Sequence, residues 1–418
     1  MKNTLVIVLS LLLFSCSNTD NISQSVNINN NVKSFNDIES NKRSFSVIRT
    51  VESKYWDKIE LIRANDSNIN PEKIHHKGRQ RDPDIVKAFG TDTPSSTDFC
   101  LHDAGEPTEL KYKTPILLIH GANTTATRSW ADPEGDGKKT GLMQYLKAKG
   151  FRVFAITFAN KHGDSFIWSS HVGRAIERIK EITKSEKVDT LGHSKGGFTL
   201  RLFVSNIYKD SNPFKKDVRK AIFVAAPHRG IDYSFRHPII NWGLYEDDDN
   251  PVKYAPMSWE SMLWKGAWVD SSEMSLSGEY FPGQLQMIGK FDKIHPLSTA
   301  EQDWYTTYYG GTGFVSKSKG IDYFIQKGGN IIDKMKKSPV DPSVQFANLV
   351  GNMPNLPGIL NEMTGASDGV VFVSSTKASE DMTGLGAKLL EEKVLPLNHL
   401  DLVSNPKSME WIATQFSK

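Results

Sequence analysis

Apolar residues in the middle of the chain form runs with two alternating kinds of spacing. Some runs are short and nearly continuous, as in strands buried on both faces. Others repeat an apolar residue every three or four positions, as Val172, Ile176 and Ile179 do, which is typical of an amphipathic helix. Strands that alternate with helices require crossover connections and a parallel sheet covered on both faces, so the pattern predicts an α/β fold. The predicted strands are residues 114–119, 151–158, 187–192 and 218–227, and the predicted helices are residues 141–150, 170–183 and 194–208.

The pattern is less regular on either side of this region. Residues 47–64 are spaced as one helix, and after residue 230 the alternation stops. Five of the nine tryptophans lie between residues 242 and 304. Residues 231–313 are therefore predicted to be an insertion, either a lid over a pocket or a small core packed beside the sheet. The sheet pattern returns at residues 344–352 and 369–373, and residues 406–418 are predicted to form the last helix.

The first residues of the chain have the pattern of an export signal. Lys2 precedes an apolar run that is too short to span a bilayer comfortably. The run ends in "LFSC", which resembles the lipobox of bacterial lipoproteins and predicts a signal peptide at residues 1–15 and a lipid on Cys16. The alternative is an ordinary signal peptide with an incidental cysteine. Ser17 in place of an aspartate favours export to the outer membrane or cell surface, with the protein held there by its lipid.

Composition separates this leader from a folded body. From Ser17 to Ser44, 14 of 28 residues are Asn or Ser, too polar to form a core, so residues 16–44 are predicted to be a lipidated tether. Residues 45–418 are predicted to be one folded domain that contains the insertion. The whole chain has 38% hydrophobic residues and a formal net charge of +3, which excludes disorder throughout and makes nucleic acid an improbable partner. With Cys16 lipidated, Cys100 has no partner for a disulfide within the chain.

One motif places a serine where a nucleophile is expected. Gly192-His193-Ser194-Lys195-Gly196 matches G-x-S-x-G, with a predicted strand before it and a predicted helix after it. The glycines are needed because the serine of such a motif sits in a sharp, strained turn that leaves no room for neighbouring side chains. Ser194 is therefore the predicted nucleophile.

A serine nucleophile needs a base and an acid that orients the base. His399 lies on a loop between the last sheet strand and the final helix and is the predicted base. Two aspartates compete for the role of the acid. Asp368 lies where the sheet pattern resumes, whereas Asp292 lies inside the insertion. Asp368 is favoured and Asp292 is kept as the alternative.

The oxyanion formed during ester attack needs two backbone N–H donors. The residue after the nucleophile, Lys195, supplies one, and Ala122 in the loop after the first buried strand supplies the other. The Lys195 side chain is interpreted as a solvated ammonium group with no part in the site.

The segments "LLIHGA", "TLGHSKGG", "AAPHRG", "SDGVV" and "NHLDLV" resemble the α/β-hydrolase superfamily and, within it, the bacterial extracellular lipases. The resemblance runs from about residue 114 to residue 403 and supports Asp368 and His399 as acid and base. It also implies a structural calcium ion at Asp401, with Asn405 as a further ligand. The loop before the acid would supply another carboxylate, but it holds only Glu362, so calcium is in doubt and no cofactor is expected.

The sequence therefore predicts a lipid-anchored serine hydrolase that cleaves carboxylic esters, a lipase or esterase acting on acyl lipids. Alternatives with the same fold are a polyester depolymerase, a phospholipase or an amidase. An alternative of another class is a surface lipoprotein that binds without catalysis. The sequence leaves open the natural ester, the acyl-chain length, the oligomeric state and whether the insertion moves.

Overall fold

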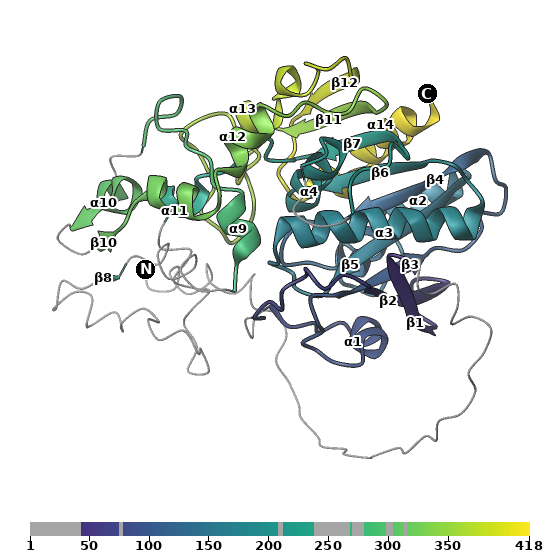
Figure 1. Ribbon diagram of the computed structural model, residues 1–418. Coiled ribbons are helices and arrows are strands. Elements are labelled where there is room, and N and C mark those ends of the chain that lie inside the picture. The colour runs from purple at the N-terminus through teal and green to yellow at the C-terminus, as the bar shows by residue number, and fades with distance from the viewer. Residues whose placement is uncertain are drawn as a thin grey trace, which may run out of the picture.

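A nine-stranded sheet forms the centre of the protein in the computed structural model, which describes residues 43–74, 78–207, 212–237, 268–269, 280–297, 304–312 and 316–418. The strands are ordered β1-β2-β3-β5-β4-β6-β7-β11-β12 across the sheet (Figure 1). They are β1 (Phe45–Val51), β2 (Lys58–Ala64), β3 (Asp98–Asp103), β4 (Tyr112–Ile119), β5 (Phe151–Phe158), β6 (Val188–His193), β7 (Val218–Val224), β11 (Gln345–Gly351) and β12 (Lys388–Leu395).

The sheet is antiparallel from β1 to β5 and parallel from β5 to β12. From β4 the chain continues to β5 on one side, and it then crosses back to β6 on the other side, so the direction of the connections reverses between β4 and β6. All parallel strands end at the same edge of the sheet, and loops at that edge are where an α/β protein places its site. The predicted α/β-hydrolase fold is confirmed by this topology.

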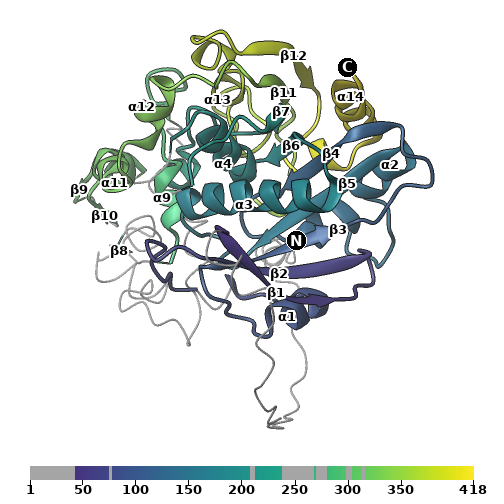
Figure 2. The same ribbon diagram turned by 45° about the vertical axis from the view of Figure 1, so that its right-hand side comes forward.

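Helices cover both faces of the sheet, as Figure 2 shows from the side. On one face α1 (Pro83–Phe89), α2 (Leu142–Ala148) and α14 (Pro406–Ser417) contribute to one large apolar core. On the other face α3 (Ser165–Thr183) and α4 (Lys195–Val204) contribute to a second core. All eight residues of β5 and all six of β6 are buried. β5 is accordingly a nearly continuous apolar run, whereas β6 also buries the polar side chains of Asp189 and Thr190.

Two predicted elements are wrong. Residues 47–64 form strands β1 and β2 of an antiparallel pair rather than one helix, because the β-branched segment 47–51 favours a strand and pairs with β2. Residues 369–373 are not a strand either. The Asp368 carboxylate accepts the amides of Val370 and Val371, which turns the chain into the short helix α13 (Val373–Thr376). The last strand is β12.

Beside the sheet lies a group of short helices, seen to the left in Figure 1. A small apolar cluster of Phe235, Ile288, Tyr308, Ile321 and Phe324 joins several of them, which fits a satellite core for the described part of the insertion. The helices are α5 (Tyr233–Arg236), α9 (Pro282–Gln286), α10 (Trp304–Tyr309), α11 (Ile321–Lys327) and α12 (Ile331–Lys336), with a small sheet of β8 (Trp268–Val269), β9 (Gly311–Thr312) and β10 (Ser316–Ser318).

Several predictions fall on parts of the chain outside the described residues. These are the signal peptide at residues 1–15, the lipidated Cys16, the tether up to residue 42 and the insertion residues 238–267 with their tryptophans. Within the part that the structure describes, no helix has the length and apolar character needed to cross a membrane.

Candidate active site

Ser194 occupies the turn between β6 and α4 with a backbone that non-glycine residues rarely adopt. Its φ of 53° and ψ of −125° place it in the left-handed half of conformational space. A Cβ on Gly192 would lie 2.6 Å from the Gly196 carbonyl oxygen, and a Cβ on Gly196 would lie 2.4 Å from the His120 carbonyl oxygen. Only glycine fits both positions. Ser194 is half-buried while its neighbours are buried, so the turn presents this serine at the sheet edge.

The structure brings Asp368 and His399 together on the loops that follow β11 and β12. The His399 Nδ1 lies 2.7 Å from the Asp368 Oδ2, and the His399 amide donates to the Asp368 carbonyl oxygen at 2.9 Å. A carboxylate only accepts, so Nδ1 carries the proton and Nε2 is left as a base. Both side chains are buried.

His193 connects this pair to the serine. Its ring lies 4.9 Å from the ring of His399, centroid to centroid, and its Nε2 donates to the His399 carbonyl oxygen at 3.0 Å. Burial lowers the pKa of His193 to about 3, so the ring is neutral and holds its place by this hydrogen bond. Because His193 directly precedes Ser194, the three residues share one end of the sheet.

The competing acid lies elsewhere. Asp292 follows α9 in the insertion, and its Oδ2 accepts a hydrogen bond from the Tyr309 hydroxyl at 2.9 Å. That contact is exposed to solvent, and the His399 Nδ1 is already paired with Asp368. The geometry thus joins the histidine to the aspartate that the sequence favours.

The loop after β4 passes close to Ser194. A Cβ on Gly121 would lie only 3.0 Å from the Ser194 Cβ, so this glycine lets the loop approach. The His120 ring fixes the loop, because its Nδ1 donates to the Gly121 carbonyl oxygen at 2.7 Å while its Nε2 accepts the Phe158 amide at 3.4 Å. Ala122 follows and is half-buried. Lys195 is the first residue of α4, where a helix leaves its amide without an intrahelical acceptor.

The interpretation of the Lys195 side chain as solvated is wrong. Lys195 is 0% exposed, and its Nζ lies 3.0 Å from the centroid of the Trp168 ring. The cause is the insertion: α9 covers this side chain at Gly283, where a Cβ would lie 2.2 Å from the Lys195 Cε. No local pattern could reveal this contact, since α9 lies far along the chain.

The residues implied as calcium ligands do not fit that ion. The Asp401 Oδ2 accepts from the Asn398 side chain, and the Asn405 Oδ1 caps α14 by accepting the Lys407 amide. Glu362 faces cationic or protonated groups instead of a metal. Among the described residues, no group of three or more His, Cys, Asp or Glu side chains is arranged to hold a metal ion. These contacts of Asp401, Asn405 and Glu362 give no support to the calcium site that the resemblance implies.

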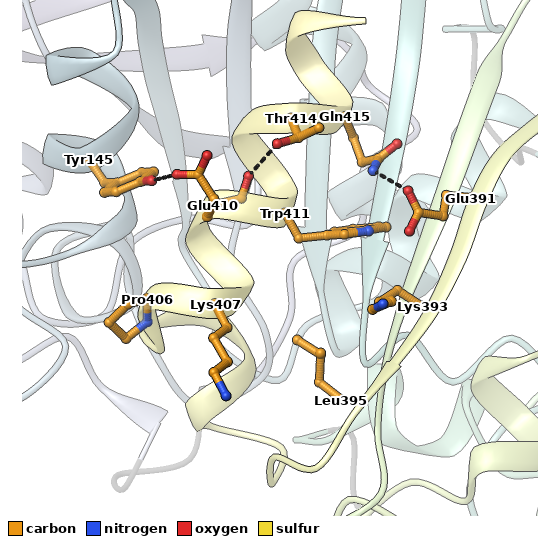
Figure 3. Close-up of a pocket in the computed structure, with 10 residues that line it drawn as sticks. All are labelled: Tyr145, Glu391, Lys393, Leu395, Pro406, Lys407, Glu410, Trp411, Thr414 and Gln415. Carbon is orange, nitrogen blue, oxygen red and sulfur yellow. Dashed lines mark hydrogen bonds between the residues drawn. The ribbon is translucent and has the colours of Figure 1, made fainter.

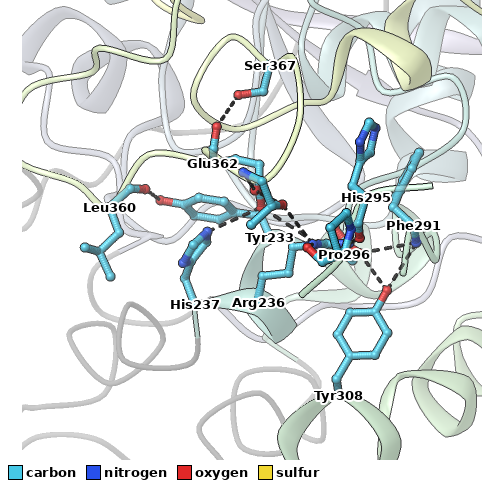
Figure 4. Close-up of polar contacts among 12 residues, drawn as sticks. Tyr233, Arg236, His237, Phe291, His295, Pro296, Tyr308, Leu360, Glu362 and Ser367 are labelled. Carbon is cyan, nitrogen blue, oxygen red and sulfur yellow. Dashed lines mark hydrogen bonds and ion pairs between the residues drawn. The ribbon is translucent and has the colours of Figure 1, made fainter. Parts of the chain in front are cut away.

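Glu362 belongs to a buried polar cluster that joins α5 to the loop carrying Asp368 (Figure 4). Its Oε2 lies 3.3 Å from the His237 Nε2 and 3.8 Å from the Arg236 Nε, and its Oε1 accepts from Thr364. The Arg236 guanidinium also pairs with Asp232 at 2.8 Å. Burial raises the pKa of Glu362, but the hydrogen bonds from His237 and Thr364 outweigh it and hold the pKa below its ordinary value.

Replacing Glu362 by glutamine is expected to destabilise the protein by about 1 to 2 kcal/mol at neutral pH, because Arg236 loses one of its two buried carboxylates and keeps Asp232. Since the folded pKa of Glu362 is lowered, its contribution is complete above its ordinary pKa of 4.5 and is lost as the pH falls through the folded value. Urea unfolding at several pH values measures both effects. A chelator should leave the melting temperature unchanged, and a chelator-induced decrease or a fully stable E362Q variant would contradict this role.

A surface pocket of about 770 Å³ lies between α14, α2 and β12 (Figure 3). Trp411 lies in it with Tyr145 and Glu410 on one side and Glu391 on the other. None of the residues that line it is a predicted site residue, so the candidate site is described by the side chains around Ser194.

Cys100 does not belong to the candidate site. It is fully buried in β3, and burial raises the pKa of its thiol well above the ordinary value.

The sheet topology is that of the α/β-hydrolase fold. Residues 113–235, which run from β4 through Ser194 to α5, match the model of the family Lipase (class 2). With this match, the protein is a carboxylic ester hydrolase.

Solved structures of bacterial enzymes resemble this chain at low sequence identity. The mature form of a lipase from Bacillus licheniformis is 14% identical, with 76% of this chain and 97% of that chain covered and a TM-score of 0.40. A thermostable carboxyl esterase from Bacillus coagulans, in complex with glycerol, is 11% identical, with coverage of 90% and 99% and a TM-score of 0.42. The fold assignment rests on the strand order of this chain itself.

Proposed function

We propose that this protein is a serine hydrolase that cleaves carboxylic esters of acyl lipids through an acyl-enzyme on Ser194. The observation that carries the proposal is the 2.7 Å contact between the His399 Nδ1 and Asp368, at the sheet edge where the strained turn presents Ser194. This contact leaves the His399 Nε2 as a base, and the hydrogen bond from His193 to the His399 carbonyl oxygen ties the histidine to the residue before Ser194.

In the proposed reaction, the Ser194 Oγ attacks the ester carbonyl carbon as the His399 Nε2 takes its proton. The carbonyl electron pair moves to the oxygen, which accepts hydrogen bonds from the amides of Ala122 and Lys195. When the tetrahedral intermediate collapses, the alcohol leaves with the proton from Nε2. Water then repeats the sequence on the acyl-enzyme, releasing the carboxylic acid and restoring Ser194. Asp368 holds the histidine tautomer and stabilises its positive form.

The proposal extends to where the reaction takes place. A lipid on Cys16 would hold the folded domain near a membrane of the cell envelope, within reach of acyl lipids. The "LFSC" sequence after the apolar run supports the anchor, and the polar composition of residues 16–44 supports a spacer between lipid and enzyme.

A series of esters from acetate to palmitate tests the substrate class. If the acyl chain is bound in an apolar site, kcat/KM rises beyond acetate, by about fourfold for each further methylene that the protein buries. Hydrolysis of emulsified long-chain esters should exceed that of soluble acetate at equal ester concentration. A maximum on acetate, with emulsions left intact, would remove acyl lipids as the substrate while leaving the serine mechanism standing.

A further inference from the structure

The burial of the Lys195 side chain is energetically unfavourable. Its side chain is fully buried, and among the described residues its Nζ has no hydrogen-bond partner. Burying an amine or ammonium group without such a partner costs free energy in either protonation state. Burial accordingly lowers the pKa of Lys195, and the charges of Glu72 and Asp164 oppose that shift. A methionine of nearly the same length would avoid this cost. Stability therefore does not explain why the residue at this position is a lysine.

The Lys195 Nζ lies on the face of an aromatic ring that is itself firmly held. Trp168 of α3 is buried, stacks on Phe158 with centroids 3.9 Å apart, and donates its indole N–H to the Asn160 carbonyl oxygen at 3.1 Å. An N–H group above an indole face, of an amine or of an ammonium ion, is attracted by the negative charge of the ring, most strongly where water is excluded. This attraction fixes the Lys195 side chain to α3.

The same indole supports the loop on the other side of the serine. Its ring contacts His120 edge to face, with centroids 5.3 Å apart and an interplanar angle of 76°. His120 holds the Gly121 carbonyl oxygen and thereby sets the direction of the chain into Ala122. Trp168 therefore contacts the side chains that adjoin both proposed oxyanion donors, the amides of Lys195 and Ala122.

Helix α9 of the insertion covers the Lys195 side chain. In α9, the Gly283 amide donates to the His162 carbonyl oxygen at 3.1 Å. The Gln286 side chain accepts from the Ser165 amide at 2.7 Å and donates to the Asp164 carboxylate at 2.8 Å. These bonds dock α9 on the start of α3, directly over the Lys195 side chain.

We propose that Lys195 and Trp168 are positioning residues that set the distance between the two oxyanion donors, with α9 as the cover that keeps water from the Lys195 amino group. The inference rests on the proposed function, because the amides of Lys195 and Ala122 are oxyanion donors only if Ser194 attacks an ester. The side chain of Lys195 acts through its own backbone N–H, which it holds in place, and neither side chain touches the substrate.

The Lys195→Met variant of the full chain tests the proposal. We expect kcat to fall by about 10- to 100-fold, because a displacement of a donor by a fraction of an ångström weakens a transition-state contact. KM should stay within about twofold, since the donors act on charge that develops only in the transition state. The rate of Ser194 labelling by a fluorophosphonate should fall with kcat, while the melting temperature stays the same or rises.

Lys220 offers a matched control. It is also buried, but its Nζ donates to the carbonyl oxygens of Gln415 and Phe416, on the far side of the sheet from α3 and α4. Lys220→Met should lower the melting temperature, because two acceptors lose their donor, and should leave kcat unchanged. Wild-type kcat in K195M, or a loss of kcat that accompanies a lower melting temperature, would overturn the proposal.

Trp168 provides an independent variant should K195M fail to fold. Trp168→Phe keeps an aromatic face and should retain more activity than Trp168→Leu. In the K195M background, the Trp168→Leu change should cost less than it costs alone, since the two residues act as a pair. Strictly additive losses would contradict the pairing. If Ser194→Ala retained activity, the proposed function itself would fail, which is a separate outcome from a fully active K195M.

Discussion

Ser194→Ala is expected to lower kcat for ester hydrolysis by about 10⁴- to 10⁶-fold, because the acyl-enzyme can no longer form. A fluorophosphonate probe should label the wild-type protein and leave the variant unlabelled. Ser185→Ala is the matched control, since Ser185 is half-buried in the turn after α3 and hydrogen-bonds to Thr183 and Lys187 beside it. Equal labelling of the wild type and Ser194→Ala would rule out Ser194 as the nucleophile.

The same position allows a separation of activity from stability. Ser194 holds a φ of 53°, which an L-residue adopts at a cost and glycine adopts freely. Ser194→Gly should therefore be inactive and yet more stable than the wild type by about 1 kcal/mol, as urea unfolding can measure. An inactive, less stable Ser194→Gly variant would mean that the serine side chain contributes to the fold, and its loss of activity would then have a second explanation.

Asp368→Asn is expected to lower kcat by about 10⁴-fold with KM little changed, because an amide donor facing the His399 Nδ1 favours the wrong tautomer. Asp292→Asn should keep wild-type kcat, since its partner is the Tyr309 hydroxyl. Steady-state kinetics of the two variants side by side measure the difference. Circular dichroism should show that both retain the fold.

The reverse pattern, a near-inactive Asp292→Asn and an active Asp368→Asn, would exchange the two aspartates in the proposed triad. Loss of activity in both would instead indicate that Asp292 supports the insertion against the site. The amides of Val370 and Val371 both donate to the Asp368 Oδ1, and the side-chain oxygen of asparagine can still accept them, so this variant should keep most of its stability.

The central strands were predictable because burial on both faces leaves a signal in every residue. β5 is apolar at most of its positions, and both β5 and β6 are buried and lie between two neighbours in the sheet. The segment 47–64 lacks this signal: β1 is an exposed edge strand, so its spacing also fits an amphipathic helix. The strand predicted at residues 369–373 is wrong for another reason. The Asp368 carboxylate determines the turn there, and the apolar run does not.

In the candidate site too, local features were predictable from the sequence and long-range contacts were not. The turn at Ser194 is local, so its glycines are visible in the motif. The Asp368–His399 contact joins residues 31 apart on two loops, and the sequence could only rank Asp368 above Asp292. The bond from His193 to the His399 carbonyl oxygen spans 206 residues and had no signal in either segment. Burial of Lys195 depends on the insertion, whose docking follows from contacts and not from periodicity.

The strand order also makes the two ends of the chain unequal as points of attachment. The N-terminal side enters the fold at β1, and β2, β3, β5 and β4 lie between that strand and β6, which leads into Ser194. The C-terminal helix α14 starts just after the His399 loop. A pulling force on the N-terminal side would detach β1 from its edge of the sheet and leave the strands that carry the candidate site paired. The same force on α14 would act next to His399. For immobilisation on a surface, the N-terminal end is the one to hold.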